Sequence, residues 1–206
     1  MRSSQVKDVS TCHQECFADS LSSKFGLTYT QKTFEWFLAA ENRFLFYIES
    51  QDRVIGYCGG FKSAFPGDGS TSGMLQYAMK EAIMAIIKKP HLIFHQELRR
   101  RYPLIAKNIF RKIFRNKRIE MTAIDHVTPN SKIGLVVIGV HPDYRGKGVF
   151  ELLMKNFEEE SKKRGAEKII LSVKSSNARA IAAYKKSGWE IASQTKKDID
   201  MFKIIV

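Results

Sequence analysis

An eight-residue turn, HPDYRGKG at 141–148, carries residue types that could bind an anion. Gly146 and Gly148 have no side chains, so the backbone amides of the turn can approach a ligand closely. Arg145 and Lys147 add positive charge, and the amino terminus of the helix predicted after the turn adds about half a charge more. The spacing fits neither G-x-x-x-x-G-K-[ST] nor G-x-G-x-x-G. It predicts a pyrophosphate site of another kind; the alternative is a plain basic turn before a helix.

A second set of spaced residues follows the next apolar run. Asn177, Ala180 and Tyr184 recur at near-helical spacing, and Gly188-Trp189 ends that segment. A phenol is a protonated hydrogen-bond donor at neutral pH, so the Tyr184 hydroxyl could donate to a ligand. The alternative is an aromatic side chain that is partly buried against the core.

The hydrophobic pattern predicts the elements that must position these residues. Helices are expected at 10–25, at 30–40 with Thr33 as a cap, at 148–164 and at 177–187. Strands are expected at 44–49, 54–61, 119–127, 132–140, 168–174, 189–195 and 199–206. The run at 132–140 is apolar on both faces, as in a central strand that is covered on both sides. Glycine, proline and serine predict a loop at 65–73.

The charge of the chain is concentrated in one segment. The 206 residues carry a net +13, and residues 73–118 hold 12 Lys and Arg against 2 Asp and Glu. Within this segment, residues 74–118 predict two or three helices. These helices either cover the sheet or a ligand site, or lie on anionic lipid or an acidic partner. Nucleic acid is not favoured, because no recognised binding motif accompanies the basic residues.

The composition is that of one globular domain. We expect a single domain at 1–206 with a basic helical insertion at about 70–118, as a monomer or homodimer. Three cysteines cannot all pair, which argues against a disulfide framework, and Cys12-His13-Cys16 lacks the further ligands of a zinc site. No apolar signal segment and no spanning run is visible. We expect a cytoplasmic protein that binds no metal ion. Peripheral contact with the inner membrane surface is expected as a further property.

Taken together, the strand at 132–140, the R-G-x-G turn, the helix and strand after it, and N-x-x-A-x-x-x-Y-x-x-x-G-W at 177–189 strongly resemble the GCN5-related N-acetyltransferase (GNAT) superfamily. The resemblance covers 132–192 closely and 10–61 only by the order of elements. It implies an α/β (α+β) fold with a mixed, mainly antiparallel sheet and helices on both faces. It also implies transfer of an acetyl group from acetyl-CoA to an amine.

The resemblance assigns roles to residues of this sequence. Pantetheine would lie along the central strand where it splays from its neighbour, at Ile138, Gly139 and Val140. The pyrophosphate would sit on the amides of Arg145, Gly146, Lys147, Gly148, Val149 and Phe150. Asn177 would meet the pantetheine arm, Ala180 would leave room beside it, and Tyr184 would protonate or hydrogen-bond the departing thiolate. Phe150 departs from the pattern, since the family prefers Gly or Ala there, and its ring must turn away or shield the site.

The general base is the least defined part of the site. Families of this type use Glu, Asp or a water chain; Glu120 is preferred here, with Asp125, His126 and His141 as further candidates. The amine would attack directly in a ternary complex, with the amide of Val140 or a neighbour polarising the carbonyl. A loose likeness of the insertion to proteins of surface-polysaccharide synthesis favours an amino sugar as acceptor. A protein amino terminus, a lysine or a polyamine stays open, as does a non-catalytic module that binds CoA or an anionic surface.

Overall fold

The computed structural model describes residues 3–63, 70–99 and 132–205. Its helices are α1 (Ser3–Cys16), α2 (Leu21–Phe25), α3 (Leu27–Leu38), α4 (Ser70–Tyr77), α5 (Met79–Lys88), α7 (Val149–Lys163) and α8 (Ala178–Lys186), with 3-10 turns η1 (Pro90–Phe94) and η2 (Pro142–Tyr144). Its strands are β1 (Arg43–Ser50), β2 (Arg53–Lys62), β3 (Lys132–Val140), β4 (Lys168–Lys174), β5 (Glu190–Gln194) and β6 (Asp198–Ile204).

These strands form one six-stranded sheet in the order β1-β2-β3-β4-β6-β5. Every neighbouring pair is antiparallel except β3 and β4, which run parallel. The parallel pair needs a crossover connection, which α7 supplies between the two strands. The predicted mixed, mainly antiparallel sheet is thus confirmed, with 132–140 as an internal strand.

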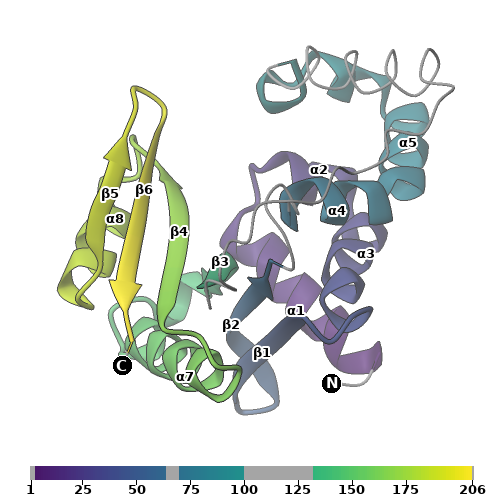
Figure 1. Ribbon diagram of the computed structural model, residues 1–206. Helices are drawn as coiled ribbons and strands as arrows, with labels where there is room; N and C mark the ends of the chain where they lie inside the picture. The colour runs from purple at the N-terminus through teal and green to yellow at the C-terminus, as the bar shows by residue number, and fades with distance from the viewer. Residues whose placement is uncertain (1–2, 64–69, 100–131, 206) are drawn as a thin grey trace, which may run out of the picture.

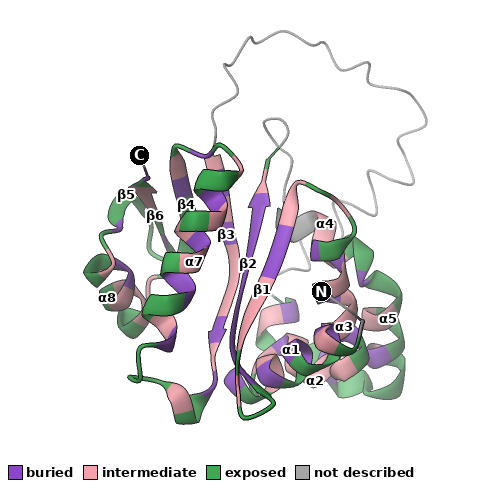
Figure 2. Ribbon diagram, turned by 90° about the horizontal axis from the view of Figure 1, so that it is seen from below, coloured by how far each residue is buried: buried purple, intermediate pink, exposed green. Residues whose placement is uncertain are grey.

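Helices cover both faces of the sheet (Figures 1 and 2). On one face, α1 and α3 pack on β1, β2 and β3 through a core that contains Val9, Phe34, Phe37 and Tyr57. On the other face, α7 packs on the same strands through Leu153 and other buried residues, and Tyr184 of α8 belongs to that second core. Burying one apolar face of each helix against the sheet supplies most of the favourable free energy of such a fold.

The amino-terminal helices differ from the prediction. The first helix begins at Ser3 and ends at Cys16, because Val6, Val9, Cys12 and Cys16 form a buried stripe at helical spacing among polar residues. Thr33 is not a helix cap: it lies inside α3 and is buried, where its hydroxyl donates to the carbonyl of Thr30 at 2.7 Å. The residue that precedes α3 is Gly26.

The first described helix between β2 and β3 begins at Ser70. The loop predicted at 65–73 falls partly outside the described residues, but α4 already starts at Ser70. The helical prediction for 74–118 is confirmed up to Phe94, and its remainder from 100 onwards, like the strand predicted at 119–127, lies outside the described residues. None of the helices in the described ranges is both long and apolar enough to cross a lipid bilayer.

Candidate functional site

The parallel strands β3 and β4 stay together for only a short distance. Their pairing runs from Lys132 opposite Lys168 to Gly134 opposite Ile170 and then ends. On its other side, β3 remains paired with β2 as far as Val140, which lies opposite Gly56. Within the described residues, the β4 side of 135–140 therefore has no strand partner. Backbone donors and acceptors on that side are available to a ligand.

Ile138, Gly139 and Val140 all lie on this open part of β3. Gly139 also has a structural reason to be glycine. Tyr57 is its cross-strand partner, and a Cβ atom on Gly139 would lie 2.5 Å from the Tyr57 hydroxyl oxygen. The Tyr57 ring therefore lies directly over Gly139, on the face of the sheet that α1 and α3 cover.

The turn after β3 has the backbone conformation that its glycines predict. Gly146 and Gly148 have φ values of +77° and +79°, in the left-handed region that residues with a Cβ rarely adopt, and both are exposed. The amides of Arg145 and Lys147 donate within the turn, at 3.3 and 3.4 Å, to the carbonyls of Pro142 and Tyr144. Two of the six amides predicted to bind pyrophosphate are thus already used.

The other four amides remain open. Those of Gly146, Gly148, Val149 and Phe150 have no acceptor among the described residues. Gly148 precedes α7 and offers no side-chain cap, so the first turn of this fifteen-residue helix presents unsatisfied N–H groups beside the turn. Together with the partial positive charge of the helix terminus, these amides suit an anion.

The two basic side chains of the turn behave differently. Arg145 is directed back at the protein, where Nε donates to the carbonyl of Val140 and Nη2 to the carbonyl of Cys16, both at 3.2 Å. Lys147 is exposed, and its ammonium lies 5.3 Å from the centre of the Tyr144 ring. Arg145 therefore ties the turn to the carboxyl end of α1, whereas the exposed ammonium of Lys147 has no hydrogen-bond or ion-pair partner among the described residues.

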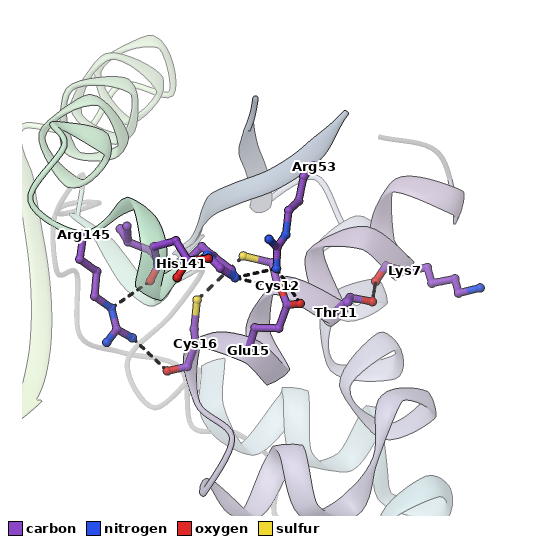
Figure 3. A network of polar contacts seen from close by, with 10 residues as sticks. Lys7, Thr11, Cys12, Glu15, Cys16, Arg53, His141 and Arg145 are labelled. Carbon is purple, nitrogen blue, oxygen red and sulfur yellow. Dashed lines mark hydrogen bonds and ion pairs between the residues drawn. The ribbon is translucent and has the colours of Figure 1, made fainter. Parts of the chain in front are cut away.

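A polar network strengthens this tie between α1, β2 and the turn (Figure 3). Arg53 donates through Nη2 to Glu15 Oε1 at 2.8 Å and lies 2.8 Å from Nε2 of His141. Glu15 Oε2 is 3.4 Å from the same ring nitrogen. The other ring nitrogen of His141 accepts from the amide of Asp143 at 3.3 Å and so caps η2. Both nitrogens of His141, a candidate base, are thus engaged in holding the turn.

Tyr184 lies buried between two aromatic rings. Its ring centre is 5.6 Å from that of Phe150, at an interplanar angle of 62°, and 5.8 Å from that of Trp189. Burial raises the pKa of the Tyr184 phenol above its ordinary value, and the nearby Cys58 thiol contributes in the same direction. The phenol therefore keeps its proton throughout the physiological range.

The remaining residues of the α8 motif have local roles. Asn177 is exposed and caps α8, with Oδ1 accepting from the amide of Ala180 at 3.2 Å. Ala180 is half-buried and packs against the core that contains Tyr184. The motif thus shapes the start of the helix that carries the tyrosine.

A partly buried hydrogen-bonded chain beneath the site was missed by sequence reasoning. The Tyr57 hydroxyl lies 2.5 Å from Nδ1 of His13, and Nε2 of His13 lies 2.9 Å from Oγ of Ser22. Burial lowers the pKa of His13 from 6.5 to about 4, so this imidazole is neutral at pH 7. The His13 ring therefore contacts Tyr57 and Ser22. Cys12 and Cys16 are free thiols that hydrogen-bond to each other, with their Sγ atoms 3.9 Å apart.

Three candidate bases, Glu120, Asp125 and His126, lie outside the described residues. Within residues 3–63, 70–99 and 132–205, no group of three or more His, Cys, Asp or Glu side chains gathers as metal ligands would. The described part of the site therefore contains a backbone cradle and a buried phenol.

Sequence comparison finds relatives for the part of the chain that carries this site. Residues 91–189 match the model of the acetyltransferase (GNAT) family. A curated acetyltransferase of Sodalis glossinidius is 41% identical over 54 residues, and one of Pectobacterium atrosepticum is 40% identical over 53. Each match covers 26% of this chain and 38% of the relative. The chain thus spans about two fifths of the length of the curated relatives that it matches.

Comparison of folds extends the similarity to the whole chain. The ribosomal-protein-S18-alanine N-acetyltransferase of Escherichia coli aligns over 100% of this chain and 90% of its own, with a TM-score of 0.56 and 17% identity. The acetyltransferase yncA of Salmonella typhimurium, solved with its cofactor acetyl-CoA, aligns over 100% of this chain and 91% of its own, with a TM-score of 0.58 and 12% identity. The match to the acetyltransferase (GNAT) family thus covers just under half of the chain, at residues 91–189, and the solved structures show that the whole chain shares the fold of these acetyltransferases.

Proposed function

We propose that this chain is an N-acetyltransferase that moves an acetyl group from acetyl-CoA to a primary amine. One observation carries the proposal: the opening between β3 and β4 leads directly into a turn with four open amides. A long ligand with a thioester at one end and a pyrophosphate further along would need these two features in this order. The family match and the acetyl-CoA held by yncA support the same assignment.

The amides of Gly146, Gly148, Val149 and Phe150 would hold the pyrophosphate. Their N–H groups have no other acceptor in the described part of the chain, and the φ values of the two glycines bring the backbone close to the ligand. The exposed Lys147 would add a positive charge beside them. Arg145 would act indirectly, since its guanidinium binds the carbonyls of Val140 and Cys16 and so keeps the turn in place.

Ile138, Gly139 and Val140 would hold the pantetheine arm through their backbone groups. Acetyl-CoA supplies an activated thioester whose carbonyl oxygen becomes negative during transfer. The amide of Val140 or a neighbour would stabilise that charge, as a preorganised backbone donor can. Asn177 and Ala180 would border the arm from α8.

Tyr184 would hold the proton that the departing thiolate needs. Its buried phenol stays protonated well above neutral pH, and a positioned acid of this kind contributes about a hundredfold or more to a rate. No covalent intermediate on the enzyme is required. Cys12, Cys16 and Cys58 are all buried, which keeps their thiols away from a substrate. Burial raises the pKa of the Cys58 thiol well above its ordinary value, whereas the hydrogen bond with Cys12 lowers the pKa of Cys16.

The proton of the amine would leave to Glu120 or to water. This part stays a prediction, because Glu120 lies outside the described residues. As acceptor we propose an amino sugar of the kind used in surface polysaccharides, in line with the helical segment between β2 and β3. A protein amino terminus, a lysine and a polyamine are the competing acceptors.

Thiol release from acetyl-CoA in the presence of an amine panel tests the activity. The panel contains amino sugars, nucleotide-linked amino sugars, peptides with free amino termini and polyamines. Turnover with any of them supports the proposal, and the preferred amine identifies the acceptor. A chain whose melting temperature rises with CoA, but which turns over no amine, would instead be a binding module. If CoA leaves the melting temperature unchanged, the assignment of the pyrophosphate site to residues 146–150 is refuted.

A surface contact with anionic lipid is a second proposed property. Seven apolar side chains on α4, α5 and η1 are 41–77% exposed, namely Tyr77, Met79, Ile83, Met84, Ile87, Ile93 and Phe94. Lys80, Lys88 and Lys89 lie in the same helical segment. Exposed apolar residues beside lysines are typical of a helix that lies in the plane of a membrane surface. The enzyme would then work in the cytoplasm at the inner membrane surface.

Co-sedimentation with vesicles of neutral and of anionic lipid tests this contact. Binding to anionic vesicles that weakens with salt and is lost in Ile87→Asp/Phe94→Asp would support it. Ile204→Asp is the matched control, since Ile204 is 54% exposed on β6. Absence of binding to anionic vesicles at low salt would refute it.

A further inference from the structure

The sheet ends on one side with β1, a long and apolar edge strand (Figure 1). β1 has eight residues, and its centre, Phe44-Leu45-Phe46-Tyr47-Ile48, is apolar without interruption. At the other end of the sheet, β5 has only five residues, all of them exposed. Within the described residues, β1 pairs with β2 alone, which leaves one row of its backbone N–H and C=O groups without a strand partner.

β1 lacks the devices with which edge strands usually avoid further pairing. Such strands commonly carry lysine, proline or a bulge of their own. β1 contains neither lysine nor proline. The one irregularity in its ladder places the extra residue, Ile55, on β2, because Ile48 lies opposite Gly56 and Glu49 opposite Val54. The free edge of β1 is thus a regular template for another strand.

A groove of about 760 Å³ runs beside this edge. β1 contributes Arg43–Tyr47 to its lining. The end of α3 with the connection that follows it, and the last turns of α7 with Arg164, contribute the rest. Arg43 is held at one end of the groove, with its guanidinium carbon 3.8 Å from the centre of the Trp36 ring. Its Nε atom is buried and has no hydrogen-bond acceptor in the described part of the chain. Nη1 of Arg43 donates to the carbonyl of Trp36 at 2.8 Å. The edge therefore combines an open backbone with a cation whose hydrogen-bonding capacity is only partly used.

We propose that a second copy of this chain pairs with β1, strand against antiparallel strand, about a two-fold axis at Phe46. In this register Arg43 lies opposite Glu49 of the second copy, and Glu49 opposite its Arg43, so both ends carry opposite charges. Phe44 lies opposite Ile48, Leu45 opposite Tyr47, and Phe46 opposite itself. Every apolar residue thus meets an apolar residue on the same face of the sheet, which is the arrangement that stabilises antiparallel pairs.

Neighbouring registers lack this complementarity. A two-fold axis at Leu45 would set Glu49 against Glu41 of the second copy. A shift by one residue would bring side chains from opposite faces against each other, which costs the burial of one face. The strand is therefore self-complementary in one register, and a two-fold contact of this kind closes at a dimer.

Light scattering coupled to size exclusion, with the full chain at micromolar concentration and physiological ionic strength, tests the proposal. We expect a mass of twice 23.6 kDa. Glu49→Lys should raise the dissociation constant of the dimer about tenfold or more, because two opposite-charge pairs become two like-charge pairs. Glu190→Lys on β5 is the matched control and should leave that constant unchanged.

Thiol cross-linking tests the register. In Phe46→Cys the two introduced thiols face each other across the axis, with Cβ atoms about 5 Å apart, and mild oxidation should link the two copies. In Ile48→Cys they lie about 13 Å apart along the strands, and no link should form. A wild-type monomer, equal cross-linking of both variants, or a dimer that Glu49→Lys does not weaken would each overturn the proposal. A monomer with exchange-protected β1 amides would mean that another part of the chain covers this edge.

Discussion

The ring of Phe150 meets the ring of Tyr184 edge to face, with centres 5.6 Å apart and planes at 62°. Phe150 stands on the first turn of α7, at a position where the family pattern favours a small residue. Its amide is one of the four that remain open in the turn, whereas its side chain is directed at the candidate acid. Phe150 therefore connects the two parts of the proposed site: its amide belongs to the pyrophosphate site, and its ring contacts the proposed proton donor.

Replacing Phe150 by alanine should weaken catalysis more than cofactor binding. The edge-to-face contact is worth about 1 kcal/mol, and its loss frees the Tyr184 ring to leave its position. We expect kcat to fall roughly fivefold, while the CoA dissociation constant, measured by calorimetry, stays within about threefold because the amide remains. The kcat of Phe150→Leu should lie between those of the wild type and Phe150→Ala. A loss of CoA affinity at full kcat would contradict this role.

Tyr184→Phe removes the proton donor and keeps the ring. The aromatic contacts with Phe150 and Trp189 persist, so the melting temperature and the CoA dissociation constant should barely change. Turnover should fall about a hundredfold, the usual contribution of a positioned acid. Because burial raises the pKa of Tyr184, the wild-type rate should not decline up to pH 9 through loss of this proton. Turnover within about twofold of wild type would exclude Tyr184 as the acid.

Gly148→Ala and Gly165→Ala form a matched pair at the two ends of α7. Their φ values are +79° and +71°, and an added Cβ would meet no atom within 4 Å in either case. Each alanine should cost about 1 kcal/mol of folding stability from backbone strain alone. Only Gly148→Ala changes the turn beside the open amides, so it alone should weaken CoA binding, by about tenfold. Equal CoA affinities of the two variants would contradict this placement.

Acid should destabilise the protein through His13. Burial lowers its pKa from 6.5 to about 4, so between these pH values the unfolded chain binds a proton that the folded chain does not. This contribution to stability is complete above pH 6.5 and is lost as the pH falls towards 4, by at most about 3 kcal/mol. Urea unfolding at a series of pH values measures it. His13→Gln should remove this dependence of the unfolding free energy on pH. His91→Gln, which changes an exposed residue, should leave the dependence unchanged.

Local patterns were sufficient for much of the fold. The strands and helices from 132 onwards agree with prediction to within one or two residues, because the strands are clear apolar runs and Gly165 and Gly188 follow the two amphipathic helices. The first helix was misplaced because its polar composition concealed the buried stripe from Val6 to Cys16. Thr33 had the right residue type for a cap but lies where the chain is already helical.

The sequence by itself determined the turn at 145–148, since left-handed glycines, basic neighbours and a helix start are properties of adjacent residues. It also marked Tyr184 through a motif within one helix. The tertiary structure alone decided what these residues touch: Tyr57 over Gly139, Arg145 on the carbonyl of Cys16 at 3.2 Å, and Arg53 between Glu15 and His141. These partners are far apart along the chain, and only the packing of α1 and β2 against the end of β3 brings them together.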